Sequence, residues 1–99
     1  MEAHKTWEPY DPTWLVELAR EQHPDKPWLA DALAACTRCR RRSAAYIHFV
    51  NNERPNQAGS EWQFDTNLEL QSPTEGEIIL DVLTGQRVGG LELINKIEM

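Results

Sequence analysis

The chain has 99 residues, 40% of them apolar and 26% charged, which is typical of one globular domain. Its formal net charge of −6 is opposite in sign to that of most nucleic-acid binders, and no apolar run approaches the roughly 18 residues of a membrane span. The acidic first residues do not resemble a signal peptide, so the two cysteines favour a reducing compartment. We therefore expect a single cytoplasmic domain, 1–99, with neither a membrane nor a nucleic-acid partner. Such an acidic surface favours a basic protein partner, although it also serves solubility alone.

The first part of the domain, 1–43, is expected to be helical. Asp11 is suited to an N-cap and Pro12 to the first helical position. Apolar residues then recur at helical spacing. The helix should end near Gln22, because Pro24 disfavours helical geometry in the residue before it.

A second helix is expected to follow, with Asp25 suited to its N-cap and Pro27 in its first turn. It is predicted to end in the arginine-rich segment "TRCRRRS", because cationic side chains complement the negative end of a helix dipole. Cys36 and Cys39 would then lie at the end of this helix.

The second part, 44–97, changes to the alternating pattern of β-strands. Turn-forming residues make Asn51–Ser60 an exposed loop, and an irregularity is expected at Asp65–Asn67. Thr84 and Gly85 suit a hairpin turn in which the glycine takes a positive φ. The four segments with strand character are Ala44–Val50, Glu61–Leu70, 77–83 and 87–94.

Segregated helices and strands indicate an α+β fold, with two N-terminal helices packed on one face of a three- to four-stranded antiparallel meander. The other face of the sheet would be open to water or to a partner. Asp81 and Glu92 lie on the adjacent strands of the last hairpin, but the sequence does not determine whether they share a face. Gly89 and Gly90 weaken the last strand and indicate a β-bulge, or a large ring packed against bare backbone.

Three strand segments resemble a small bacterial family of unknown function, the domain family numbered 2283. The family has an Ala-x-Tyr-Ile-x-Phe-like strand, a glycine-led strand that ends in aspartate, and an Arg-Val-x-Gly strand. The matching segments here are Ala44–Phe49, Gly76–Asp81 and Arg87–Ile94. The resemblance covers the C-terminal half, and the insert from Asn51 to Glu61 and the helical first part depart from it. It implies no reaction and no catalytic residues.

The acidic chain, with its Trp-x-Phe segment, glycine-led apolar strand and Gly-Gly strand, is also similar to immunity proteins of secreted bacterial toxins. Those proteins are cytoplasmic and noncatalytic, and each blocks one toxin by binding it. The likeness implies a noncatalytic binding protein that occludes a basic toxin domain. The candidate acidic rim is Glu61, Asp65, Glu69, Asp81 and Glu92, and the candidate aromatic anchors are Trp7 and Tyr10.

A basic cluster and a CxxC pair support a second hypothesis, a small regulatory or ligand-binding protein. The cluster is suited to an anion or nucleic acid, and the pair, Cys36 and Cys39, to a metal. A zinc site needs four ligands, however, and the histidines are scattered at His4, His23 and His48. We therefore interpret the cysteines as packing residues. The cluster, which we interpret as a helix end, consists of Arg38, Arg40, Arg41 and Arg42.

Catalytic motifs are not recognisable in the chain. Neither Ser43 nor Ser60 lies in a nucleophile elbow, no glycine-rich phosphate loop precedes a helix, and no carboxylate pair has an apolar setting. An enzyme of unknown type is therefore the third of the three hypotheses, and we expect neither a cofactor nor a metal. Asp81 and Glu92 are expected to act in recognition rather than in acid–base chemistry.

Overall fold

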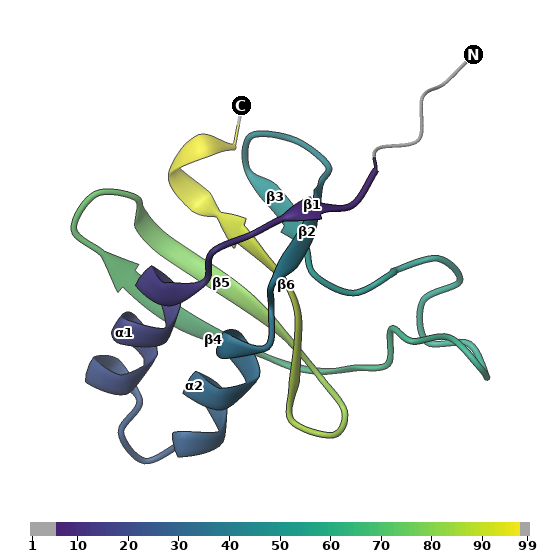
Figure 1. The fold of residues 1–99 in the computed structure, drawn as a ribbon, viewed down its shortest axis with the longest axis horizontal. Coiled ribbons are helices and arrows are strands. Elements are labelled where there is room, and N and C mark those ends of the chain that lie inside the picture. The colour runs from purple at the N-terminus through teal and green to yellow at the C-terminus, as the bar shows by residue number, and fades with distance from the viewer. Residues whose placement is uncertain (1–5, 98–99) are drawn as a thin grey trace.

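The computed structural model describes residues 6–97, which form two helices and a six-stranded antiparallel sheet (Figure 1). The predicted α+β class is therefore confirmed. The helices are α1 (Thr13–Gln22) and α2 (Pro27–Ala34). Across the sheet, the strands are β1 (Glu8–Pro9), β2 (Arg38–Arg41), β3 (Tyr46–His48), β6 (Arg87–Leu93), β5 (Gly76–Leu83) and β4 (Phe64–Ser72). A short 3₁₀ helix, η1 (Ile94–Lys96), follows β6.

The prediction of three or four strands was too low, because β1 and β2 lie in the part that was predicted to be helical. α2 ends at Ala34, and the arginine-rich segment forms β2 instead of a last helical turn. β2 pairs with β1 on one side and with β3 on the other. Cys39, in the middle of β2, is 0% exposed. Pairing on both edges and burial of this side chain outweigh the local preference for a helix end.

The helix starts differ slightly from the prediction. α1 begins at Thr13, one residue later than expected, and the Asp11 carboxylate accepts a hydrogen bond from the Thr13 N–H at 3.0 Å. α1 ends at Gln22, as predicted. Asp25 does not cap α2, because its carboxylate instead forms an ion pair with Lys26 at 3.0 Å.

The core lies between the two helices and one face of the sheet. Helical spacing turns one apolar stripe of each helix toward the sheet, and alternation turns every second strand residue toward the helices. The largest buried side chains of this layer are Leu15, Leu29 and Leu33 from the helices and Leu70, Ile78, Leu80 and Leu91 from the strands. The helices lie together on one side of the sheet (Figure 1), so the opposite face is left to other contacts.

The hairpin of β5 and β6 has both features that its glycines predicted. Gly85 takes a φ of +81° in the turn, and the ladder shifts register between Asp81 and Val82. A β-carbon on Gly89 would lie 2.8 Å from Cζ3 of Trp62, so a large ring packs directly on this backbone. Trp62 ends the loop between β3 and β4, which extends away from the helices (Figure 1).

Replacing Gly90 by alanine is expected to destabilise the fold by about 1–3 kcal/mol, as overpacking does. The added β-carbon would lie 2.7 Å from the carbonyl oxygen of Ile47, and a backbone atom of a paired strand does not move away as a side chain does. Urea denaturation measures the loss. Thr84→Ala, at an exposed position in the turn, is the control and should stay within about 0.5 kcal/mol of wild type. Equal stability of the two variants would contradict the close approach at Gly90.

Candidate functional site

Three of the predicted carboxylates share the face of the sheet opposite the helices. Ile79 pairs with both Glu69 and Glu92, and Asp81 lies two residues further along β5. Paired residues, and residues two apart on one strand, point to the same side of a sheet. Glu69, Asp81 and Glu92 therefore lie side by side on β4, β5 and β6. We call this surface the acidic face.

Asp81 is held in place by two side chains from other strands. The Tyr46 hydroxyl donates a hydrogen bond to Oδ2 of Asp81 at 2.9 Å, and the Asn67 amide donates to Oδ1 at 2.9 Å. Because Tyr46 is on β3 and Asp81 on β5, the tyrosine side chain crosses over β6. Burial and then the bond to Asp81 raise the pKa of Tyr46, so its hydroxyl remains a donor at neutral pH. The carboxylate is thus oriented before any partner arrives.

His48 is enclosed beside Tyr46 and Asp81. It is only 3% exposed, and its ring lies 4.7 Å from the Tyr46 ring and 5.4 Å from the Trp62 ring, between centroids. Among the described residues, nothing hydrogen-bonds to its buried Nδ1. Burial, followed by the positive charges of Arg42 and Arg40, lowers the pKa of His48 to about 4. At neutral pH the ring is therefore uncharged. It is buried beside the Tyr46 and Trp62 rings and is not placed to exchange protons with a substrate.

The sequence did not single out Tyr46, Asn67 or His48. Alternation within Ala44–Val50 is a signal that Tyr46 and His48 share a face. Only the pairing of Tyr46 with Glu92 and of His48 with Gly90 shows that this is the face of Asp81.

A cavity of about 390 Å³ adjoins the acidic face at the start of β3. The carboxylate-bearing Glu92 and the Tyr46 ring line one part of it, and the 39% exposed Ile97 lines another. Lys96 also lines it, but its ammonium group is 3.3 Å from the Glu75 carboxylate. Such a lining suits a long cationic side chain, whose methylene groups pack on apolar surface while its charge meets a carboxylate.

The two predicted aromatic anchors have different surroundings. The Tyr10 ring packs against Phe49, 5.1 Å between centroids, and its hydroxyl accepts a hydrogen bond from Trp14 at 3.0 Å. Tyr10 therefore belongs largely to the core. Trp7 is half-buried, and the guanidinium carbons of Arg38 and Arg40 lie 4.4 and 4.7 Å from its ring centroid. Its ring is thus engaged in cation–π contacts within the protein.

The structure divides the basic cluster between two sides of the sheet. Arg40 pairs with His48 and shares its face, whereas Arg41 pairs with Ile47, which belongs to the core side. Nε of Arg41 lies 3.6 Å from the Glu8 carboxylate. Arg42 follows β2 in the turn to β3. The four guanidinium groups therefore do not converge on one anion site.

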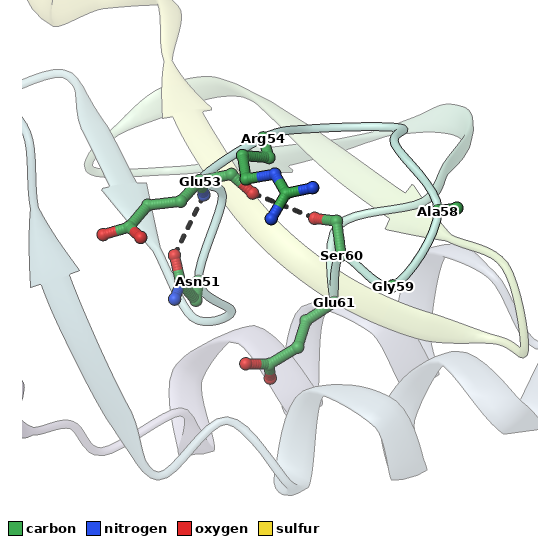
Figure 2. A pocket seen from close by; sticks show the side chains of 7 residues that line it. All are labelled: Asn51, Glu53, Arg54, Ala58, Gly59, Ser60 and Glu61. Carbon is green, nitrogen blue, oxygen red and sulfur yellow. Dashed lines mark hydrogen bonds between the residues drawn. The ribbon is translucent and has the colours of Figure 1, made fainter.

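Glu61 lies in the loop 51–63, outside the acidic face, and Asp65 lies next to this loop at the start of β4. Figure 2 shows the loop folded on itself, with the Ser60 hydroxyl donating to the Glu53 carbonyl at 3.0 Å. The loop surrounds a small cavity of about 210 Å³, and the Glu61 side chain points away from the Arg54 guanidinium (Figure 2). Asp65 is exposed at the register shift in β4, where the predicted irregularity is confirmed.

Both cysteines are free and buried. The Cys36 thiol points to the carbonyl oxygens of Ala32 and Val88, at 3.4 and 3.9 Å. Burial raises the pKa of Cys36 to about 12, and it also raises that of Cys39. The prediction that Cys39 lies at a helix end was wrong, because this residue lies in β2. Neutral buried thiols pack as small apolar groups.

Residues 6–97 contain no group of three or more His, Cys, Asp or Glu side chains that is placed to bind a metal ion. None of the helices in this part of the chain has the length and apolar character needed to cross a bilayer. His4 lies outside the described residues.

Comparisons with protein-family models, curated proteins and solved structures found no match for this chain. The resemblances to the family numbered 2283 and to immunity proteins therefore remain predictions.

Iodoacetamide is expected to alkylate Cys36 and Cys39 of the native protein more than about tenfold more slowly than free cysteine at neutral pH, because buried thiols with raised pKa values supply little thiolate. The protein unfolded in urea is the control, and both thiols should react there at the rate of the free amino acid. Native thiols that react as fast as free cysteine would show that the pair is accessible and reactive.

Replacing His48 by phenylalanine is expected to make stability less dependent on pH between pH 6.5 and 4. The unfolded chain binds this proton near the ordinary pKa of 6.5, and the folded protein only near 4. The stability that neutral His48 contributes is therefore complete above about pH 6.5, falls as the pH decreases, and is lost below about 4.

Urea denaturation across this range measures the effect. Wild type should lose on the order of 2 kcal/mol more than His48→Phe, which keeps an aromatic ring beside Tyr46 and Trp62. Parallel curves for the two proteins would mean that His48 titrates normally in the folded state.

Proposed function

We propose that the protein is a noncatalytic binding protein that presents its acidic face to a protein partner. The observation that carries this proposal is the alignment of Glu69, Asp81 and Glu92 on three adjacent strands, on the side of the sheet away from the helices. Strands hold their side chains at fixed spacing, so the carboxylates form a pattern that a partner's cationic groups can match.

The geometry of Asp81 supports recognition rather than chemistry. Its two oxygens accept hydrogen bonds from Tyr46 and Asn67, which satisfy only part of the hydrogen-bonding capacity of the carboxylate. A fixed carboxylate loses little side-chain entropy when a cation binds. The cavity beside Glu92 and Ile97 offers a place for the stem of a lysine or arginine side chain.

In its most concrete form, the proposal is an immunity-type inhibitor that occludes the basic site of a secreted toxin in the bacterial cytoplasm. The net charge of −6 supports rapid encounter with a basic domain. Apolar anchoring would come from the exposed Phe64 and Ile97 more than from Tyr10, because Tyr10 is packed on the core. Trp7 would contribute at the other edge, together with the arginines over its ring.

The double variant Asp81→Asn with Glu92→Gln is expected to bind its partner more weakly by about 1–3 kcal/mol, mainly through slower association. The partner is obtained by pull-down from the source organism, and association rates are measured over a range of salt concentrations. Added salt should slow the wild type toward the variant, because it screens the same charges.

The matched control is Glu17→Gln with Glu21→Gln, which removes the same charge from exposed positions on α1. Amide spectra of both variants establish that they fold. If the two double variants associate at the same rate and with the same salt dependence, the acidic face is not the interaction surface.

A further inference from the structure

The outer edge of β4 is the longest strand edge in the described part of the chain. β4 has nine residues, whereas β1, the strand at the other end of the sheet, has two and includes Pro9. A strand edge presents backbone N–H and C=O groups, and proteins usually cover it or interrupt it.

Two side chains from the end of α1 cover only the second half of this edge. The Gln22 amide accepts a hydrogen bond from the Gln71 N–H at 2.7 Å and donates one to the Gln71 carbonyl at 2.7 Å, as a neighbouring strand would. Nε2 of His23 lies 2.7 Å from the Glu69 carbonyl oxygen. α1 lies beside this end of β4 (Figure 1). The side chains of Gln22 and His23 therefore cover the edge only from Glu69 onward.

The first half of the edge is covered only at Phe64, whose N–H donates a hydrogen bond to Oδ1 of Asn56 at 2.8 Å, so Asp65–Leu68 is left open. Backbone groups in an antiparallel ladder alternate between the two sides of a strand, so the N–H and C=O of Asn67 point outward, as those of Gln71 do. The Asn67 side chain does not cover them, because it donates to the Leu80 carbonyl and to Asp81. Within residues 6–97, no other side chain hydrogen-bonds to the Asn67 backbone. Phe64 is 42% exposed at the start of this half.

We infer that the open half of β4 takes an extended, lysine- or arginine-containing segment of a partner protein as a seventh strand. Strand addition gives affinity through main-chain hydrogen bonds, and side chains at alternate positions give specificity. The exposed carboxylates of Asp65 and Glu69 flank the free backbone groups of Asn67, so alternate basic residues of the added strand would lie beside them. The added strand would extend the sheet next to the acidic face.

The same charges disfavour a second copy of this chain at the edge. In an antiparallel pair of two β4 strands centred on Asn67, Asp65 of one copy would lie opposite Glu69 of the other. Like charges directly opposite each other destabilise a strand pair. In a cationic segment, by contrast, basic side chains would lie opposite the carboxylates of Asp65 and Glu69.

A synthetic peptide of alternating lysine and threonine residues is the probe, added to the isotope-labelled full chain at millimolar concentration. Bound peptide should shift the amide signals of Asp65–Leu68 and slow hydrogen exchange at Asn67. A peptide of alternating glutamate and threonine, and a lysine peptide with N-methylated backbone amides, are the controls and should not bind.

Two variants at one position isolate the outward backbone donor. Asn67→Pro removes the N–H that faces away from β5, and Asn67→Ala keeps it, while both lose the same side-chain bonds. The peptide should bind Asn67→Pro about tenfold more weakly than Asn67→Ala, as expected for lost main-chain hydrogen bonds. Amide spectra of both variants test that each is folded.

The inference rests on the proposed function only in requiring a protein partner, and it can fail separately. Equal peptide affinity for Asn67→Pro and Asn67→Ala, absence of binding to wild type, or signal shifts confined to other strands would overturn it. Protection of Asn67 that grows with protein concentration in the absence of peptide would assign the edge to a second copy instead. The variants at Asp81 and Glu92 test the acidic face and leave the outward groups of Asn67 unchanged.

Discussion

Packing on the open side of the sheet, the face away from the helices, depends on two consecutive residues without side chains in a central strand. β6 lies between β3 and β5, and Gly89 and Gly90 leave its backbone bare. The Trp62 ring packs on Gly89, and the His48 ring lies against Gly90. Three consequences follow from this contact: the loop 51–63 is anchored, His48 is enclosed, and the Tyr46 side chain reaches across β6 to Asp81.

The open side has opposite charges at its two ends. Arg38 and Arg40 lie near Trp7 at the β1–β2 end, while Glu69 lies on β4 at the other end. A surface with separated charges favours one orientation of a charged partner over the reverse, because the reverse brings like charges together. The buried aromatic residues between the two ends, His48 and Trp62, make the separation a fixed property of the fold.

The sequence predicted the sheet segments after residue 44 better than the segments before it, for a physical reason. The last hairpin carries strong local signals: alternation, a turn glycine, and paired glycines at the bulge. β2 has no such signal, since its four residues become a strand only through pairing with β1 and β3. Judged from local sequence alone, arginines that follow a helix therefore indicate a helix end.

The candidate site was predictable only in part, because its contacts join distant positions. Glu69, Asp81 and Glu92 were named from the sequence, but their common face depends on the register between strands. The bond between Tyr46 and Asp81 spans 35 positions in the chain, and the bond between Gln22 and Gln71 spans 49. No periodicity marks a side chain that acts as a strand neighbour, and Gln22 is an ordinary polar residue at a helix end.

The bonds of Gln22 to Gln71 also bear on how the chain folds. The helix that carries Gln22 is synthesised before β4, so it is complete when the last strands leave the ribosome. Local helical contacts form in microseconds, whereas strand pairing over long separations is slower. Once β4 and β5 pair, the outer edge at Gln71 meets a side chain that is already available. The part of β4 around Leu70, between Glu69 and Gln71, is thereby protected from pairing with other unfolded chains during assembly.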